Sequence, residues 1–111
     1  MPDRAQLEAI AIMFKAFADP TRLLLMQALR TGTKNVGQLV EELKLTQANV
    51  SKHLQTLYDA KILSREKRGT ATFYTIDDHF IYPLCELVCD KINRENVDRR
   101  PVEFTAPDYA I

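Results

Sequence analysis

The sequence has few glycines, few cysteines and no long hydrophobic run. Its three glycines are widely separated, so the chain has no glycine-rich loop of the kind that holds a phosphate. No apolar stretch approaches the roughly 20 residues that cross a bilayer, and the charges in the first 17 residues are typical of an amphipathic helix rather than a signal peptide. Two cysteines without a secretion signal indicate a reducing compartment. We therefore expect a cytoplasmic protein with no membrane partner.

The charges balance, with 15 basic and 15 acidic residues, and a net charge of zero does not by itself favour binding to nucleic acid. Their distribution is uneven, however. Between residues 44 and 70, six basic side chains stand against two acidic ones, a local excess of four positive charges. Such an excess is typical of a surface that faces phosphates, although solvated protein faces carry it too. The six are Lys44, Lys52, Lys61, Arg65, Lys67 and Arg68.

The first half of the chain shows helical periodicity interrupted by capping residues. Residues 5–17 carry a broad apolar stripe. Asp19, Asn35 and Thr46 are residue types that cap helix N-termini, and each is followed by apolar positions at helical spacing. Only two residues separate the third helix from the cap of the fourth, and this spacing predicts a helix-turn-helix.

A β-hairpin is predicted directly after the fourth helix. Residues 62–67 and 70–76 alternate strand-forming residues on either side of Arg68-Gly69, where glycine permits a tight reversal beside basic side chains. Helical periodicity resumes over residues 78–95, whereas residues 96–111 carry no predicted element. The expected fold is mainly α with a β wing, in the order α-α-α-α-β-β-α, and 111 residues is the length of one domain.

Two segments of the sequence resemble a known family of regulators. FADPTRLLLMQAL is similar to the second-helix motif of the ArsR/SmtB family of bacterial repressors, and LTQANVSKHLQTLYDAKILSREKRGTATFYTI is similar to its recognition helix, wing and return strand. The similarity extends from about Phe14 to Arg94. It implies a winged helix-turn-helix protein that is not an enzyme, forms homodimers through its first and last helices, and binds palindromic double-stranded DNA operators. Residues 1–95 would be the DNA-binding and dimerisation domain, and residues 96–111 a C-terminal tail.

On the recognition helix, expected at about residues 46–60, Val50 and Leu54 face the core while polar and small residues face outward. Such a helix enters the major groove and reads base edges. Basic residues of the wing, expected at about residues 62–76, would add affinity for phosphates without reading sequence. The alternative class is a protein-interaction module that has lost DNA binding. The predicted base-facing set is Gln47, Ala48, Ser51, Lys52 and Gln55, and the predicted wing set is Arg65, Lys67 and Arg68.

Two metal sites common in the resembled family are missing from this sequence. The first is written D-x-H, then ten residues, then H-x-x-E; Asp78 fills the first place, but Phe80, Lys91 and Arg94 fill the others. Phenylalanine has no donor atom, and lysine and arginine bring positive charge where a cation would bind. The second site is a C-V-C segment, to which Asn35-Val36-Gly37 corresponds without any sulfur. We expect no resident cofactor at either place.

Cys85 and Cys89 stand one turn apart on the same face of the last predicted helix. One interpretation is that they are small apolar residues packed at the dimer seam. Another is a thiol sensor that oxidants or reactive sulfur modify, or that binds a soft metal or metalloid ion. An intrahelical disulfide at this spacing is unfavourable, whereas a bridge across the dimer is easier to form. A third interpretation is that the protein is a regulator with no inducer of its own. Separately, Phe104 and Tyr109 of the tail are candidates for packing on a partner subunit.

Overall fold

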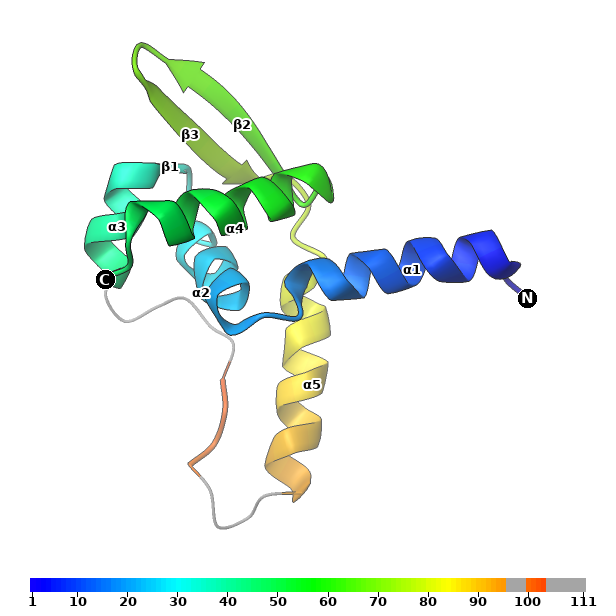
Figure 1. Cartoon of the computed structure of the whole chain (residues 1–111). Coiled ribbons are helices and arrows are strands. Elements are labelled where there is room, and N and C mark those ends of the chain that lie inside the picture. The colour runs from blue at the N-terminus through cyan, green and yellow to red at the C-terminus, as the bar shows by residue number, and fades with distance from the viewer. Residues whose placement is uncertain (96–99, 104–111) are drawn as a thin grey trace.

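The structure of the protein is a computed structural model, which describes residues 1–95 and 100–103. Within these residues the chain forms five helices and a three-stranded antiparallel sheet, with α1 and α5 extending away from the body of the molecule (Figure 1). This order confirms the predicted fold class, to which the structure adds the short strand β1. The elements are α1 (Arg4–Phe17), α2 (Pro20–Leu29), β1 (Lys34–Asn35), α3 (Val36–Leu43), α4 (Gln47–Asp59), β2 (Leu63–Arg68), β3 (Ala71–Ile76) and α5 (Ile81–Glu95).

The helices begin at the predicted capping residues. The side chain of Asp19 accepts hydrogen bonds from two backbone N–H groups in the first turn of α2, at 2.8 and 3.1 Å. Asn35 and Gln38 form a reciprocal capping box at the start of α3, and the hydroxyl of Thr46 accepts a backbone N–H of α4. These bonds satisfy donors that have no partner within the helix, and they therefore fix where each helix starts.

A single left-handed residue makes the turn between α3 and α4. Lys44 has a φ of 56° and directly follows the last residue of α3. The next residue, Leu45, donates its backbone N–H to the carbonyl of Val40 at 3.3 Å, which closes the end of the helix. The turn is therefore short, and α3 and α4 pack directly against each other as the predicted helix-turn-helix.

The wing is the hairpin of β2 and β3, and its turn lies one residue later than predicted. Arg68 pairs with Ala71 across the hairpin, so the two turn residues are Gly69 and Thr70. Gly69 has a φ of 63°, a conformation that glycine adopts without strain. The other edge of β3 pairs with β1, in the strand order β1-β3-β2. This edge ties the base of the wing to the residues immediately before α3.

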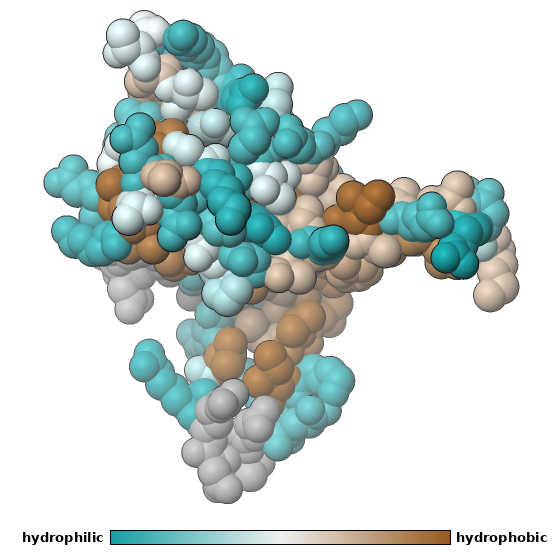
Figure 2. All heavy atoms as spheres, in the orientation of Figure 1, coloured by the Kyte–Doolittle hydropathy of each residue, from teal (hydrophilic) through white to brown (hydrophobic). Residues whose placement is uncertain are grey.

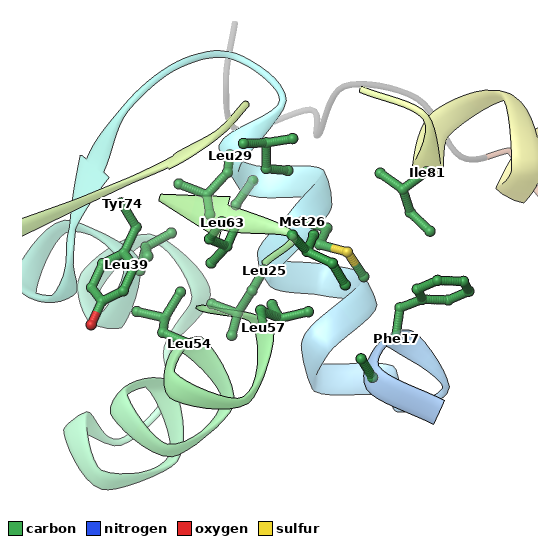
Figure 3. Close-up of a cluster of buried hydrophobic side chains, with 14 of the residues drawn as sticks. Phe17, Leu25, Met26, Leu29, Leu39, Leu54, Leu57, Leu63, Tyr74 and Ile81 are labelled. Atoms are coloured by element: carbon green, nitrogen blue, oxygen red, sulfur yellow. The ribbon is translucent and has the colours of Figure 1, made fainter. Parts of the chain in front are cut away.

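The hydrophobic core is centred on α2, which contributes side chains with no exposed surface. They pack against the inner faces of α3 and α4 and against the base of the sheet (Figure 3). The last helix is joined to this core by Tyr82, whose hydroxyl donates to the carbonyl of Met26 at 2.6 Å. The largest fully buried side chains are Leu25, Met26, Leu39, Val50, Leu54, Leu57, Ile62 and Ile81.

Both α1 and α5 present apolar side chains that none of the described residues covers. Phe14 on α1 is 51% exposed, and Leu87 and Val88 on α5 are 66% and 53% exposed. In Figure 2 these two helices carry several of the hydrophobic side chains that reach the surface. No helix among the described residues combines the length and the apolar character that a membrane crossing requires. The exposed face is thus larger than the scattered apolar residues of an ordinary monomer surface.

Part of the predicted tail returns to the last helix. The side-chain amide of Asn93 donates to the carbonyl of Val102 at 2.9 Å, and its oxygen accepts the N–H of Val102 at 2.8 Å. Residues 100–103 therefore lie against α5, a contact that the sequence did not predict. Phe104 and Tyr109 lie outside the described residues.

Candidate DNA-binding interface

The outward face of α4 is polar and exposed. Val50 and Leu54 have no exposed surface, as predicted, while all of the predicted base-facing side chains are exposed. The helix crosses the front of the molecule in Figure 1, and the surface over it is largely hydrophilic in Figure 2. The predicted inner and outer faces of the helix are therefore confirmed, and the five side chains share one accessible surface.

Three polar side chains of this face have no internal partner. Within the described residues, Gln47, Ser51 and Lys52 make no side-chain hydrogen bond or ion pair with the rest of the chain. An amide matches the edge of adenine, a hydroxyl suits several bases, and an ammonium suits guanine or a phosphate. These groups can therefore be offered to a duplex without first breaking an intramolecular contact.

The side chain of Gln55, in contrast, already forms hydrogen bonds within the chain. Its Nε2 donates to Oδ1 of Asp59 at 2.8 Å, and its Oε1 accepts from Nη1 of Arg65 at 2.9 Å. The Cζ atom of Arg65 lies 3.8 Å from the centroid of the Tyr58 ring. The side chain of Tyr74 raises the pKa of the Arg65 guanidinium above its ordinary value. The structure thus joins two predicted DNA-binding residues to each other, a contact between separate elements that helical spacing does not reveal.

The tip of the wing carries the other two predicted basic residues. Lys67 is exposed and makes no ion pair within the described part of the chain. Arg68 is paired with Glu66 at 3.4 Å, and the side chains of this pair are 55% and 68% exposed. An ion pair so exposed is worth little, so Arg68 can exchange it for a phosphate at small cost. Both cations are therefore available at the tip.

The inner face of α4 holds a histidine that sequence analysis missed. His53 is 8% exposed, and its Nδ1 lies 3.0 Å from Nη1 of Arg22 and 4.0 Å from Oδ1 of Asp19. The backbone N–H of Arg22 lowers the pKa of the Asp19 carboxyl. Its position could have been predicted from the spacing: His53 follows the buried Val50 by three residues, which puts both side chains on the inner face of the helix.

Known proteins with similar sequences are transcriptional regulators. A family profile described as bacterial regulatory protein, arsR family, matches residues 19–65, from the cap of α2 into β2. The chain is 40% identical over 82 residues to an HTH-type transcriptional regulator of Methanocaldococcus jannaschii, covering 73% of this chain and 92% of that protein. The chain belongs to the ArsR family. The resemblance seen in the sequence is thereby confirmed.

Two further relatives, both repressors, are similar to this chain. The arsenical resistance operon repressor of Bacillus subtilis is 38% identical over 79 residues, covering 68% of this chain and 75% of that protein. The crystal structure of the transcriptional repressor PagR of Bacillus anthracis matches with a TM-score of 0.65 at 31% identity, over 78% of this chain and 99% of that one. This ArsR-family chain is a winged helix-turn-helix, DNA-binding transcriptional regulator and not an enzyme.

The positions of the family's D-x-H and H-x-x-E metal site are used otherwise in this ArsR protein. Asp78 accepts the backbone N–H of Phe80 at 3.0 Å, as a capping residue does. Lys91 forms an ion pair with Glu95 one turn later. Among residues 1–95 and 100–103, no three histidine, cysteine or acidic side chains gather where they could hold a metal ion.

Both cysteines lie on the inner side of α5. Cys85 and Cys89 are buried and form no disulfide, and they line an apolar pocket of about 390 Å³ between α1, α2 and α5. Phe14 and Val102 line the same pocket. Burial raises the pKa of the Cys85 thiol to about 11, and the adjacent Cys89 contributes to the rise. Cys85 is therefore a neutral thiol at neutral pH, which makes it a weak nucleophile.

Proposed function

We propose that this ArsR-family protein is a homodimeric repressor that inserts α4 into the major groove of a palindromic operator and lays the wing on the adjacent backbone. The observation that carries the proposal is the outward face of α4, where Gln47, Ser51 and Lys52 are exposed and have no partner within the described residues. Unpartnered polar groups at the start of a recognition helix are what direct reading of bases requires.

Each side chain of the surface has a role in this proposal. Gln47, Ala48, Ser51 and Lys52 meet base edges, the alanine through the methyl group of thymine. Lys67 and Arg68 at the wing tip bind phosphates and contribute affinity that falls with salt. Gln55 and Arg65 belong to the same surface, where their mutual hydrogen bond also joins the helix to the wing.

The uncovered apolar face supports the homodimer. Phe14 of α1 and Leu87 and Val88 of α5 are more than half exposed, and α1 reaches away from the body of the chain (Figure 1). Covering such a face with the same face of a second copy removes apolar surface from water on both subunits. Two recognition helices would then read the two halves of a palindrome.

For the inducer, we propose that oxidants or reactive sulfur act at Cys85 and Cys89. The two thiols lie in one pocket that also contains Phe14 of α1, so a bulkier or bridged sulfur would displace the helices that form the proposed dimer contact. A second candidate is a soft metal or metalloid ion, because two thiols one turn apart in the same pocket can both bind it once their protons are released. The Bacillus subtilis relative is an arsenical resistance operon repressor, which is consistent with that candidate.

The test is a fluorescence-anisotropy titration of the protein onto the duplex upstream of its own gene. It is run on the reduced protein, after peroxide or polysulfide, and after arsenite, each at low and moderate salt. The reduced protein is expected to bind tightly, with an affinity that falls steeply as salt rises. The matched control is the Cys85→Ser/Cys89→Ser variant, which is expected to bind equally well and to ignore the treatments.

The outcomes separate the alternatives. Release by peroxide or polysulfide supports the thiol sensor, and release by arsenite alone supports the metalloid sensor. If no treatment changes the affinity for DNA, both cysteines have a packing role only, and the protein is a regulator without an inducer at this site. Failure of the reduced protein to bind at low salt contradicts DNA binding and favours a protein-interaction module.

A further inference from the structure

The wing of this protein is fastened to the recognition helix by one arginine. Arg65 of β2 donates from Nη1 to Oε1 of Gln55 on α4, and its guanidinium lies over the ring of Tyr58 one turn later on the same helix. Gln55 is itself oriented by its bond to Asp59. Four side chains from two elements thus form one continuous set of contacts between helix and wing.

The partner strand completes this set. Arg65 stands directly opposite Tyr74 of β3 in the antiparallel register, so the two side chains lie on the same face of the hairpin, and the side chain of Tyr74 raises the pKa of the guanidinium. Tyr74 is buried, so its position is fixed by the core. Arg65 is therefore held from α4 and from β3 at once, although the residue lies at the surface.

The wing needs such a support. Within β2, Leu63 is buried while residues 65–68 are exposed, so the hairpin leaves the body after its first residues (Figure 1). β1 pairs with β3 at Phe73 and Tyr74, so the wing is two-stranded beyond these residues, and a two-stranded hairpin is marginally stable in water. A further contact from α4 near this point restricts the wing before DNA is bound, so less orientational freedom is lost on binding.

We propose that Arg65 is a positioning residue, which sets the angle between wing and recognition helix so that both meet one duplex together. One face of its guanidinium already lies over Tyr58, and its Nη1 already donates to Gln55. Lys67 is two residues further along the same face of β2, roughly 7 Å beyond Arg65, where it extends toward the phosphates. The inference rests on the proposed DNA-binding function, and it assigns Arg65 a role other than the phosphate contact suggested by its charge.

The experiment measures the affinity of the full-length protein for the duplex upstream of its own gene as a function of salt, from about 50 to 200 mM. A lost phosphate contact lowers the slope of log K against log salt by about 0.9, whereas a lost positioning contact weakens binding and leaves the slope unchanged. The variants are Arg65→Ala, Arg65→Lys and Tyr58→Leu. The matched control on the same strand is Lys67→Ala.

We expect all three variants to bind about ten-fold more weakly with the slope of the wild type, because each loses a stacked or charge-assisted contact of roughly that worth. Tyr58→Leu is decisive, since it changes no charge and no group that faces DNA. Lys67→Ala should lower the slope. Circular dichroism and thermal unfolding of each variant establish that it is folded, and Gln55→Ala, at an exposed position, replaces any variant that is not.

Two results would overturn the proposal. The first is a slope reduced by Arg65→Ala and restored, together with the affinity, by Arg65→Lys, because charge alone would then be sufficient. The second is wild-type affinity in Tyr58→Leu. In both cases the wild type still binds DNA, so the proposed function stands. If the wild type itself does not bind, the proposed function fails, and the inference fails with it.

Discussion

The Nη1 atom of Arg22 lies 3.0 Å from Nδ1 of His53 and joins the start of α2 to the recognition helix. The same guanidinium donates to the carbonyls of Lys15 and Ala16, at 3.2 and 2.5 Å, where α1 ends. Since an arginine can only donate, the Nδ1 of His53 is the acceptor and its proton is on Nε2. One side chain therefore holds together three helices that helical periodicity treats as independent.

Replacing Arg22 by methionine should destabilise the protein. The methionine keeps an apolar stem, but the carbonyls of Lys15 and Ala16 and the ring of His53 lose their donor. We expect the free energy of unfolding in urea to fall by about 2 kcal/mol. Arg4→Met is the control because Arg4 is exposed and paired only with Glu8, and it should cost less than about 0.5 kcal/mol. Equal losses in the two variants would show that Arg22 does not connect these helices.

Elements whose cause is local in the sequence were predictable. Asp19, Asn35 and Thr46 act on N–H groups two or three residues away, so reading residue types in order was enough to find the start of three helices. The inner face of α4 followed from the spacing of Val50 and Leu54 in the same way. The candidate DNA contacts were then predicted as residues of the same helix that do not face the core.

Features that depend on contacts between elements were not predictable. β1 has two residues, too few to show alternation, and exists because β3 supplies its partner. Gln55 and Arg65 are ten residues apart on a helix and a strand, and no periodicity connects them. In the sequence, both residues fall within the basic region, but no pattern there predicts the hydrogen bond between them. Charge and residue type thus predicted a candidate surface, whereas the contacts between its residues could be seen only in the structure.

Cys85 should be slow to react with iodoacetamide near neutral pH. Measured in a Cys89→Ala variant, which leaves one thiol, the alkylation rate of the folded protein should reach half its maximum well above pH 9.0, because burial raises the pKa of this thiol. The same variant in urea should reach half its maximum rate near the ordinary pKa of 9.0. Equal profiles in the folded and unfolded protein would show that the thiol is open to solvent.

The same shift predicts how stability depends on pH. The pKa of Cys85 is higher in the folded than in the unfolded protein, so its contribution to stability is complete below pH 9 and is lost as the pH rises to about 11. Wild-type protein should therefore lose more stability over this interval than Cys85→Ala does. Urea unfolding of both proteins at several pH values provides the measurement. A difference that stays constant with pH would contradict the assignment.

Lys52→Ala should weaken binding of the operator about ten-fold, the order of one lost charge-assisted contact. Lys52 is exposed at the centre of the outward face of α4. The control is Lys91→Ala on α5, where the lysine is exposed and paired with Glu95 at a distance from the recognition helix (Figure 1). It should leave DNA affinity unchanged. Both variants are titrated onto the operator duplex at one salt concentration. An equal loss of affinity in the two would show that binding depends only on the net charge of the protein.

Val88→Glu should separate the proposed dimer. Val88 is 53% exposed on α5 beside the pocket that also contains Phe14 of α1, so dimerisation through these helices would bury the new carboxylate without a partner. We expect the dissociation constant of the dimer to rise at least about 100-fold, since an unpaired charge in an apolar contact costs several kcal/mol. Asp90→Lys changes a charge at an exposed position of α5 that is two residues from Val88 and therefore on another face of the helix, and this variant should stay dimeric. Sedimentation equilibrium measures both. A Val88→Glu variant that remains a dimer would place the subunit contact elsewhere, whereas a monomer that has also lost tight operator binding would show that two recognition helices act together.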